Sequence, residues 1–135
     1  MSKVKNVRDP QRFSLGGRAR SFSYALAGIG FMFRTQHNAW LHAIASIGVI
    51  ALGCYFDVGS ADWRWLIAAM AMVWIAETIN TALEYVCDVV SPDFHQAVKH
   101  AKDIAAGGVL IAAVAAAMVG VLVFWPKLAC IVSTL

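Results

Sequence analysis

The sequence predicts an all-α membrane protein with three transmembrane helices and an N-terminal amphipathic surface helix. Of its 135 residues, 60% are hydrophobic and 14% are charged, and the mean hydropathy is +0.66. Soluble domains of this size rarely have such a composition. The apolar residues gather in three long stretches, and most of the positive charge precedes them. We therefore expect a single membrane domain covering residues 1–135, without a linker.

The three apolar stretches are expected to be transmembrane helices at residues 39–56, 63–90 and 104–125. The first and third contain no charged residue, and the second is apolar from Trp65 up to Glu77. Each stretch approaches or exceeds the roughly 18 residues needed to cross a bilayer. The segments between them are short and polar, so the helices follow one another directly.

The distribution of positive charge predicts the orientation of the chain. Seven of the eleven Lys and Arg residues lie in the first 34 positions, and the second loop adds Lys99 and Lys102. Because such residues stay on the cytoplasmic side, we expect the N-terminus, including a basic tail at residues 1–17, in the cytoplasm. Lys127 near the C-terminus is a weaker, opposing signal. This indicates an integral membrane protein with its N-terminus and second loop on the cytoplasmic side; its expected partners are membrane lipids and not nucleic acid.

The surface helix is expected at residues 18–34. Four apolar residues spaced three or four apart form one stripe along it: Phe22, Leu26, Ile29 and Phe33. Arginines stand at both of its ends, a pattern typical of a helix lying in the membrane interface. The helix can be a simple electrostatic anchor or one wall of a site that faces lipid headgroups, and the sequence leaves both roles open.

A polar face interrupts the second apolar stretch, in AETINTALEYVCDVV. On a helix, Glu77, Glu84 and Asp88 fall within about 40° of one another, and Asn80 lies about 60° from Glu77. A carboxylate inside a membrane is costly, so these groups must face protein, water or a cation. If Trp63 marks the outer interface, a rise of about 1.5 Å per residue places Glu77 roughly 21 Å deep, beneath the cytoplasmic headgroups.

This depth profile suits a site where a water-soluble reagent meets a lipid headgroup. The deeper Glu77 can act as a general base, and the shallower Glu84 can hold Mg²⁺, which favours a few carboxylates plus phosphate oxygens. Two alternatives remain: a non-enzymatic ion or proton conductor, and a small assembly protein whose Glu77/Glu84/Asp88 stripe pairs with neighbouring helices. The outer halves of the three stretches carry no carboxylates, which argues against the conductor.

The second loop, SPDFHQAVKHAKD, adds groups that can receive phosphates. We expect a new helix to begin at Pro92, with Lys99, Lys102 and Asp103 on one face. The same charges also suit an ordinary solvated loop. The sequence has no P-loop, no kinase glycine-rich loop and no HExxH motif, so a nucleotide would be bound in another way.

AETINTALEYVCD, PDFH and AKDIAAGGVLIAA together resemble the prokaryotic diacylglycerol kinase family, which includes undecaprenol kinases. The resemblance extends from about residue 18 to 125, and the E-x-x-N-x-x-x-E-x-x-x-D spacing followed by A-K-D is highly specific. It implies a small homotrimeric kinase of the inner (cytoplasmic) membrane, with its active site on the cytoplasmic side. Such a kinase transfers the γ-phosphate of ATP, with Mg²⁺, to the hydroxyl of a lipid alcohol.

The resemblance also implies roles for individual residues. Glu77 matches the catalytic base and Glu84 a metal-binding glutamate. The nucleotide-binding positions are Asn80, Asp93, Lys102, Asp103 and Tyr24. The positions assigned to the lipid substrate are Arg18, Gly28, Asn38 and His42.

The sequence departs from the family pattern at Gln36, in TQHNAWLH, where a second metal-binding glutamate is common. An amide oxygen can still ligate Mg²⁺ but brings no charge, and Asn38 or His37 could compensate. His42 and the AAGG run at 105–108 resemble the undecaprenol kinase branch. We therefore expect both diacylglycerol and undecaprenol to be accepted, with undecaprenol slightly preferred.

Overall fold

The computed structural model describes residues 14–133, and every regular element in this range is a helix. The chain forms α1 (Leu15–Thr35), α2 (His37–Tyr55), α3 (Ser60–Val90) and α4 (Gln96–Val132). The prediction of an all-α protein is confirmed. The expected basic tail, residues 1–17, lies outside the described residues except for its last four positions, three of which belong to α1.

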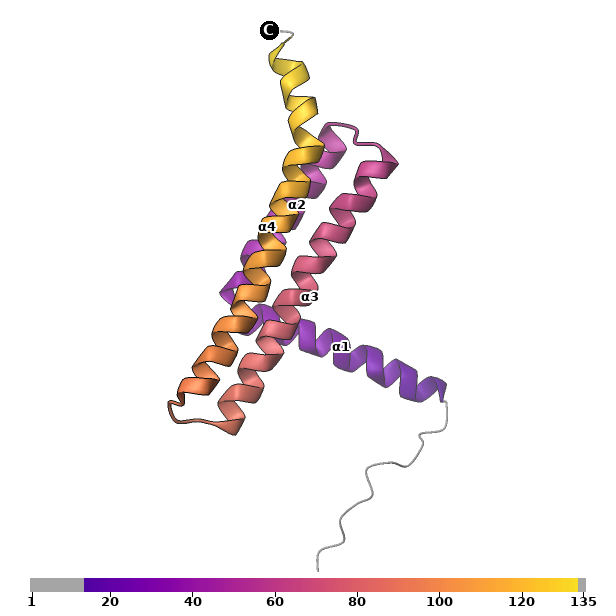
Figure 1. Ribbon diagram of the computed structural model, residues 1–135. Coiled ribbons are helices and arrows are strands. Elements are labelled where there is room, and N and C mark those ends of the chain that lie inside the picture. The colour runs from indigo at the N-terminus through magenta and orange to yellow at the C-terminus, as the bar shows by residue number, and fades with distance from the viewer. Residues whose placement is uncertain (1–13, 134–135) are drawn as a thin grey trace, which may run out of the picture.

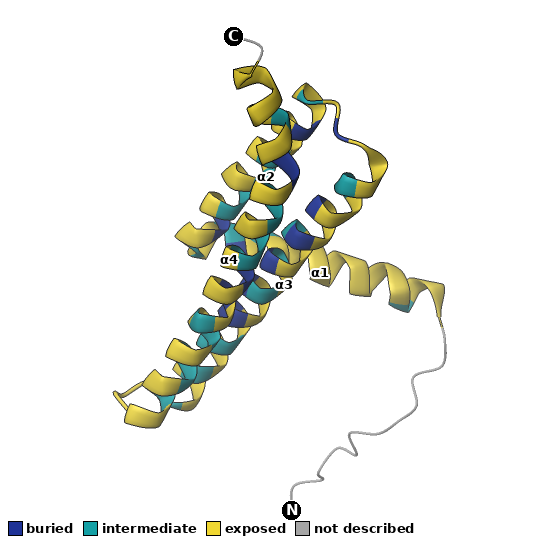
Figure 2. Ribbon diagram, turned by 45° about the horizontal axis from the view of Figure 1, so that its top comes forward, coloured by how far each residue is buried: buried dark blue, intermediate teal, exposed yellow. Residues whose placement is uncertain are grey.

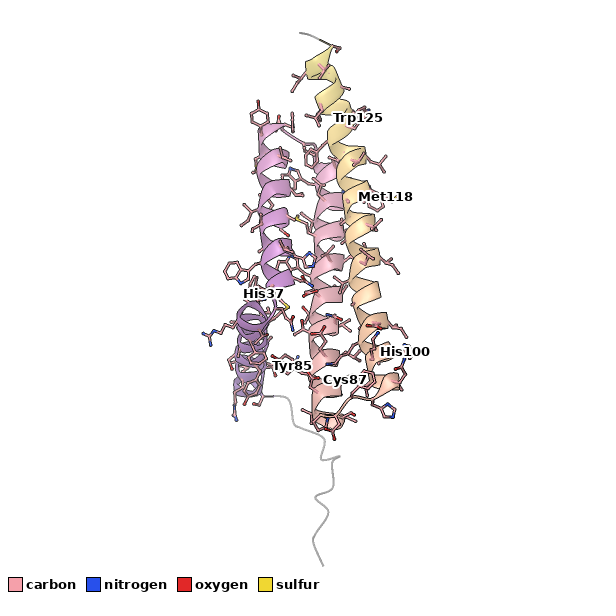
Figure 3. All side chains as sticks on the ribbon, turned by 90° about the vertical axis from the view of Figure 1, so that its left-hand side faces the viewer. His37, Tyr85, Cys87, His100, Met118 and Trp125 are labelled. Atoms are coloured by element: carbon pink, nitrogen blue, oxygen red, sulfur yellow. The ribbon has the colours of Figure 1, made fainter. Side chains whose placement is uncertain are left out.

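Three of these helices, α2, α3 and α4, are long and apolar enough to cross a membrane. They run side by side in Figures 1 and 3, with α3 and α4 packed along most of their length. A small core of Val58, Leu66, Val123 and Phe124 closes the end of the bundle near the α2–α3 turn. Most other side chains are exposed, as Figure 2 shows, which suits a surface in contact with lipid or with further copies of the chain.

The turn between α3 and α4 differs from the sequence-based expectation. The helix expected to begin at Pro92 begins at Gln96. His95 caps it, because its Nδ1 accepts a hydrogen bond from the backbone N–H of Ala97 at 3.2 Å. Residues 91–95 therefore form the turn, and α4 continues from there without interruption through Pro126.

Helix α1 leaves the bundle at a steep angle, while α3 and α4 continue past it to the 91–95 turn (Figure 1). The C-terminal end of α1 packs on the bundle. Met32 is buried, the ring centroids of Phe31 and Tyr85 are 5.1 Å apart, and those of Phe33 and Trp74 are 5.4 Å apart. Three members of the predicted apolar stripe are exposed: Phe22, Leu26 and Ile29. The position of α1 on a membrane surface remains a prediction.

A close approach of α2 and α3 depends on Gly53. A Cβ at this position would lie 2.6 Å and 2.7 Å from Cη2 and Cζ2 of Trp63. These distances are shorter than van der Waals contact, so only glycine allows the indole to lie directly on the α2 backbone. Trp63 in turn packs against the small core, which couples this contact to the end of the bundle.

We predict that Gly53→Ala destabilises the protein by about 1–3 kcal/mol, because the added methyl forces the Trp63 ring out of place. The measurement is thermal or denaturant unfolding in detergent micelles. Gly48→Ala is the matched control, because Gly48 lies on the same helix and a Cβ there would have no neighbour within 4 Å. Equal changes in stability for the two variants would show that the close approach is unimportant.

Candidate active site

Glu77 is a fully buried carboxylate on α3. Neither of its oxygens has a hydrogen-bond partner among the described residues. The nearest basic atom is Nε2 of His42 on α2, 3.8 Å from Oε2. This distance exceeds that of a hydrogen bond but lies within reach of an ion pair. Burying a carboxylate that has no hydrogen-bond partner costs much free energy. A contribution to the stability of the fold therefore does not explain the position of Glu77.

Glu84 lies two helical turns closer to the 91–95 turn and is held by two side-chain amides. Nε2 of Gln36 donates to Oε2, and Nδ2 of Asn80 donates to Oε1, each at 3.1 Å. Gln36 is the single non-helical residue between α1 and α2, with an extended backbone (φ −113°, ψ 114°). The break between these two helices therefore brings a side chain from residue 36 to α3.

The groups around Glu84 fit Mg²⁺ delivered with a nucleotide. Residues 14–133 contain no group of three or more His, Cys, Asp and Glu side chains able to hold a metal. Mg²⁺, however, is commonly bound by one or two carboxylates plus substrate phosphates. Glu84 offers a carboxylate, and Oδ1 of Asn80 is a buried acceptor with no partner in the described chain. These are hard oxygen donors of the type that Mg²⁺ requires.

A hollow of about 390 Å³ lies beside the turn between α3 and α4. Asp93 lines it, together with two exposed pairs in which Lys102 contacts Asp88 at 2.5 Å and Lys99 contacts Asp103 at 2.6 Å. Exposed pairs of this kind contribute little to stability and exchange partners readily. The two lysines can therefore turn to the phosphates of an incoming anion, while Asp93 and Asp103 remain at the rim.

The other predicted site residues are exposed in a single copy of the chain. Tyr24 on α1 is 70% exposed, and Arg18 and Asn38 are also exposed. A Cβ on Gly28 would find nothing within 4 Å. Their predicted roles in binding nucleotide or lipid therefore remain predictions.

The structure also brings in residues that the sequence analysis had not assigned to the site. Thr81 is buried four residues after Glu77, and its Oγ1 has no partner among the described residues. Its helical spacing from Glu77 could have revealed it. Trp74 makes a T-shaped ring contact with His42, with centroids 6.2 Å apart, and donates from Nε1 to Oγ of Ser46 at 3.1 Å. No sequence pattern shows this contact, since it depends on how α2 docks on α3.

An apolar groove of about 210 Å³ lies between α2, α3 and α4, with His42 among the residues that line it. The α4 wall consists of small residues: Ala113, Ala116, Ala117 and Gly120. Ser46, Met70 and Val73 contribute from the other two helices. The imidazole of His42 therefore borders both this groove and the carboxylate of Glu77.

These features define a helical membrane protein with a buried carboxylate on α3 and, beside the turn between α3 and α4, a hollow lined by lysine–aspartate pairs. Residues 23–124 match the family model of prokaryotic diacylglycerol kinase. The chain belongs to this family of lipid kinases, and the resemblance read from its motifs is confirmed.

Curated relatives carry two different names. The chain is 39% identical over 109 residues to a diacylglycerol kinase of Synechocystis sp., with 80% of this chain and 62% of that protein covered. It thus spans less than two thirds of that relative. It is 34% identical over 109 residues to the undecaprenol kinase of Bacillus subtilis, covering 81% of this chain and 89% of the relative. A diacylglycerol kinase of Escherichia coli is 24% identical over 118 residues, with 82% and 97% covered.

Proposed function

We propose that this protein is an integral membrane lipid kinase that transfers the γ-phosphate of ATP to the hydroxyl of a lipid alcohol. The observation that carries the proposal is the order of groups along α3. A fully buried Glu77 comes first, Glu84 with its two amides follows, and the hollow bordered by Asp88 and Lys102 lies beyond. The names of the relatives, diacylglycerol kinase and undecaprenol kinase, support the same activity.

In the proposed reaction, Glu77 accepts the proton of the lipid hydroxyl. The hydroxyl oxygen forms a bond to the γ-phosphorus, and the bond from that phosphorus to the β-phosphate bridging oxygen breaks, releasing ADP. Lys102 and Lys99 hold the phosphates at the hollow, with Asp93, Asp103 and Tyr24 as further nucleotide contacts. Catalysis then consists mainly of positioning and charge neutralisation, as in phosphoryl transfer generally.

Glu84 would supply the anionic ligand for Mg²⁺ and Gln36 an amide oxygen. Asn80, expected to contact the nucleotide, would also offer its partnerless Oδ1. When bound, Mg²⁺ neutralises charge on the triphosphate. Gln36 provides one negative charge fewer than a glutamate would, so we expect this site to need more Mg²⁺ than a site with two carboxylates.

We further propose that the N-terminus and the hollow face the cytoplasm of the inner membrane and that the active form is a homotrimer. The basic residues of the N-terminal segment and second loop support this orientation. A trimer would cover part of the exposed apolar surface of α2, α3 and α4 and could bring Arg18, Gly28 and Asn38 next to the lipid. A purely structural role fits less well, because packing would normally provide Glu77 with hydrogen bonds.

Replacing the proposed base should abolish chemistry without unfolding the protein. Glu77→Gln keeps the size of the side chain but cannot accept the proton, so turnover should fall by at least ~100-fold. Phosphate transfer from labelled ATP to lipid measures this, and size-exclusion chromatography checks assembly. Asp62→Asn, at the far end of the same helix, is the matched carboxylate-to-amide control. Near-normal turnover of Glu77→Gln would exclude the assignment.

The Mg²⁺ requirement should respond to Glu84 and Gln36 in opposite directions. Glu84→Gln removes an anionic ligand and should raise the Mg²⁺ concentration for half-maximal activity, whereas Gln36→Glu should lower it. Gln36→Glu also brings two carboxylates together, so its melting temperature should fall without Mg²⁺ and recover with it. Unchanged titrations in both variants would place the metal elsewhere.

The acceptor should be a lipid with a small uncharged head, because its hydroxyl must descend to the depth of Glu77. Diacylglycerol and undecaprenol both meet this condition, and we expect both to be phosphorylated, with undecaprenol slightly preferred. The test compares them in mixed micelles at equal mole fraction with labelled ATP. A clear preference for diacylglycerol would refute the proposed order of substrates. No phosphorylated lipid at any Mg²⁺ or ATP concentration would refute the kinase itself.

A further inference from the structure

Among the described residues, His42 is the basic group that faces Glu77. The amides of Gln36 and Asn80 are directed to Glu84, and Lys99 and Lys102 pair with Asp103 and Asp88. The other carboxylate on the same face of α3 is Glu84, seven residues further along the helix. Arg34 at the end of α1 is exposed, and residues 104–126 of α4 contain no titratable side chain.

The imidazole of His42 is held in place by aromatic packing. Its ring makes a T-shaped contact with Trp74, and Trp74 is itself fixed by its hydrogen bond to Ser46 and by the ring of Phe33, 5.4 Å away. Nε2 of His42 is buried and has no hydrogen-bond partner among the described residues. A nitrogen in this position costs free energy unless it interacts with the carboxylate 3.8 Å away.

A general base inside a membrane faces a conflict that His42 can resolve. Glu77 must be ionised before it can accept a proton, yet burial without a partner favours the neutral carboxyl. A nearby N–H donor or positive charge stabilises the anion and limits the orientations of the carboxylate. Nε2 of His42, 3.8 Å from Oε2, is close enough for an ion pair that favours the anion and restricts its orientation, and a small shift would bring it into hydrogen-bond distance.

We propose that His42 is the positioning residue of the base, holding Glu77 ionised and its Oε2 oriented toward the lipid hydroxyl through Nε2. This inference rests on the proposed kinase function. It goes beyond the expected role of His42 as a lipid contact, although its place beside the apolar groove allows both. The proton of the lipid hydroxyl ends on Glu77, and His42 keeps its own proton during the transfer.

The test compares His42→Leu and His42→Gln in kinase assays across pH. His42→Leu should lower kcat by about 10-fold or more, leave the KM for ATP nearly unchanged and move the acid limb of the pH–rate profile to higher pH. His42→Gln retains an N–H donor and should recover part of the loss. His100→Gln, whose side chain pairs with Gln96 near the 91–95 turn, is the matched control (Figure 3).

A double variant separates positioning from a general structural role. If His42 acts through Glu77, adding His42→Leu to Glu77→Gln should cause little further loss of activity. If the activity losses of the two single variants multiply in the double variant, or if the pH profile of His42→Leu is unchanged, the proposal is overturned. Neither result would contradict the kinase function.

A stability measurement tests the contact between His42 and Glu77 separately from activity. It is informative even if no lipid is phosphorylated, the result that would refute the kinase function. His42→Leu should lower the melting temperature at neutral pH, because an unpaired buried carboxylate remains, and Glu77→Gln in the same chain should restore part of it. Absence of this rescue would show that the two side chains do not interact.

Discussion

The arrangement of the site depends on a carboxylate that is buried within a helix apolar and long enough to cross a membrane. A charged group there is tolerated if protein surrounds it and offers a compensating partner. In this chain α2 docks on α3 so that Glu77 is fully buried and Nε2 of His42 lies 3.8 Å away. The packing of Trp74 against His42 and Phe33, and the break between α1 and α2, all maintain this arrangement. Loss of the α2–α3 contact would leave Glu77 facing hydrocarbon.

Polar residues on one face of α3 lie in different environments, because they lie at different positions along the helix axis. Residues seven apart return to nearly the same side of a helix, and each heptad advances about 10 Å along its axis. Glu77 and Glu84 therefore share a direction but differ in surroundings. Glu77 is fully buried, whereas Glu84 is half-buried and Asp88 is exposed beside Lys102. The proposed proton acceptor and the proposed metal ligand can thus lie on one helix in different environments, while the proposed phosphate contact, Lys102, comes from α4.

The chain packs sparsely on itself, and this too has a physical cause. Lipid tails are as apolar as a leucine side chain, so exposed hydrophobic residues on transmembrane helices carry no penalty of the kind they carry in water. A small core at one end and close contact between α3 and α4 suffice to align the bundle. The remaining apolar surface is free to meet lipid or further copies, which agrees with the proposed homotrimer.

The sequence by itself determined the class of protein, the three apolar helices, the polar face at Glu77, Glu84 and Asp88, and the family. These features are local, because composition and a 3.6-residue period act within one segment. Even the start of α4 was misplaced, since Pro92 is a common first residue of a helix while capping by His95 decided the boundary at Gln96. Only the tertiary structure decided that Gln36 reaches Glu84 across 48 residues and that His42 faces Glu77. Those contacts follow from the docking of α2 on α3, which depends on the extended backbone at Gln36 and on the close approach of Gly53 and Trp63. No periodicity within one helix specifies which residues of two helices will meet.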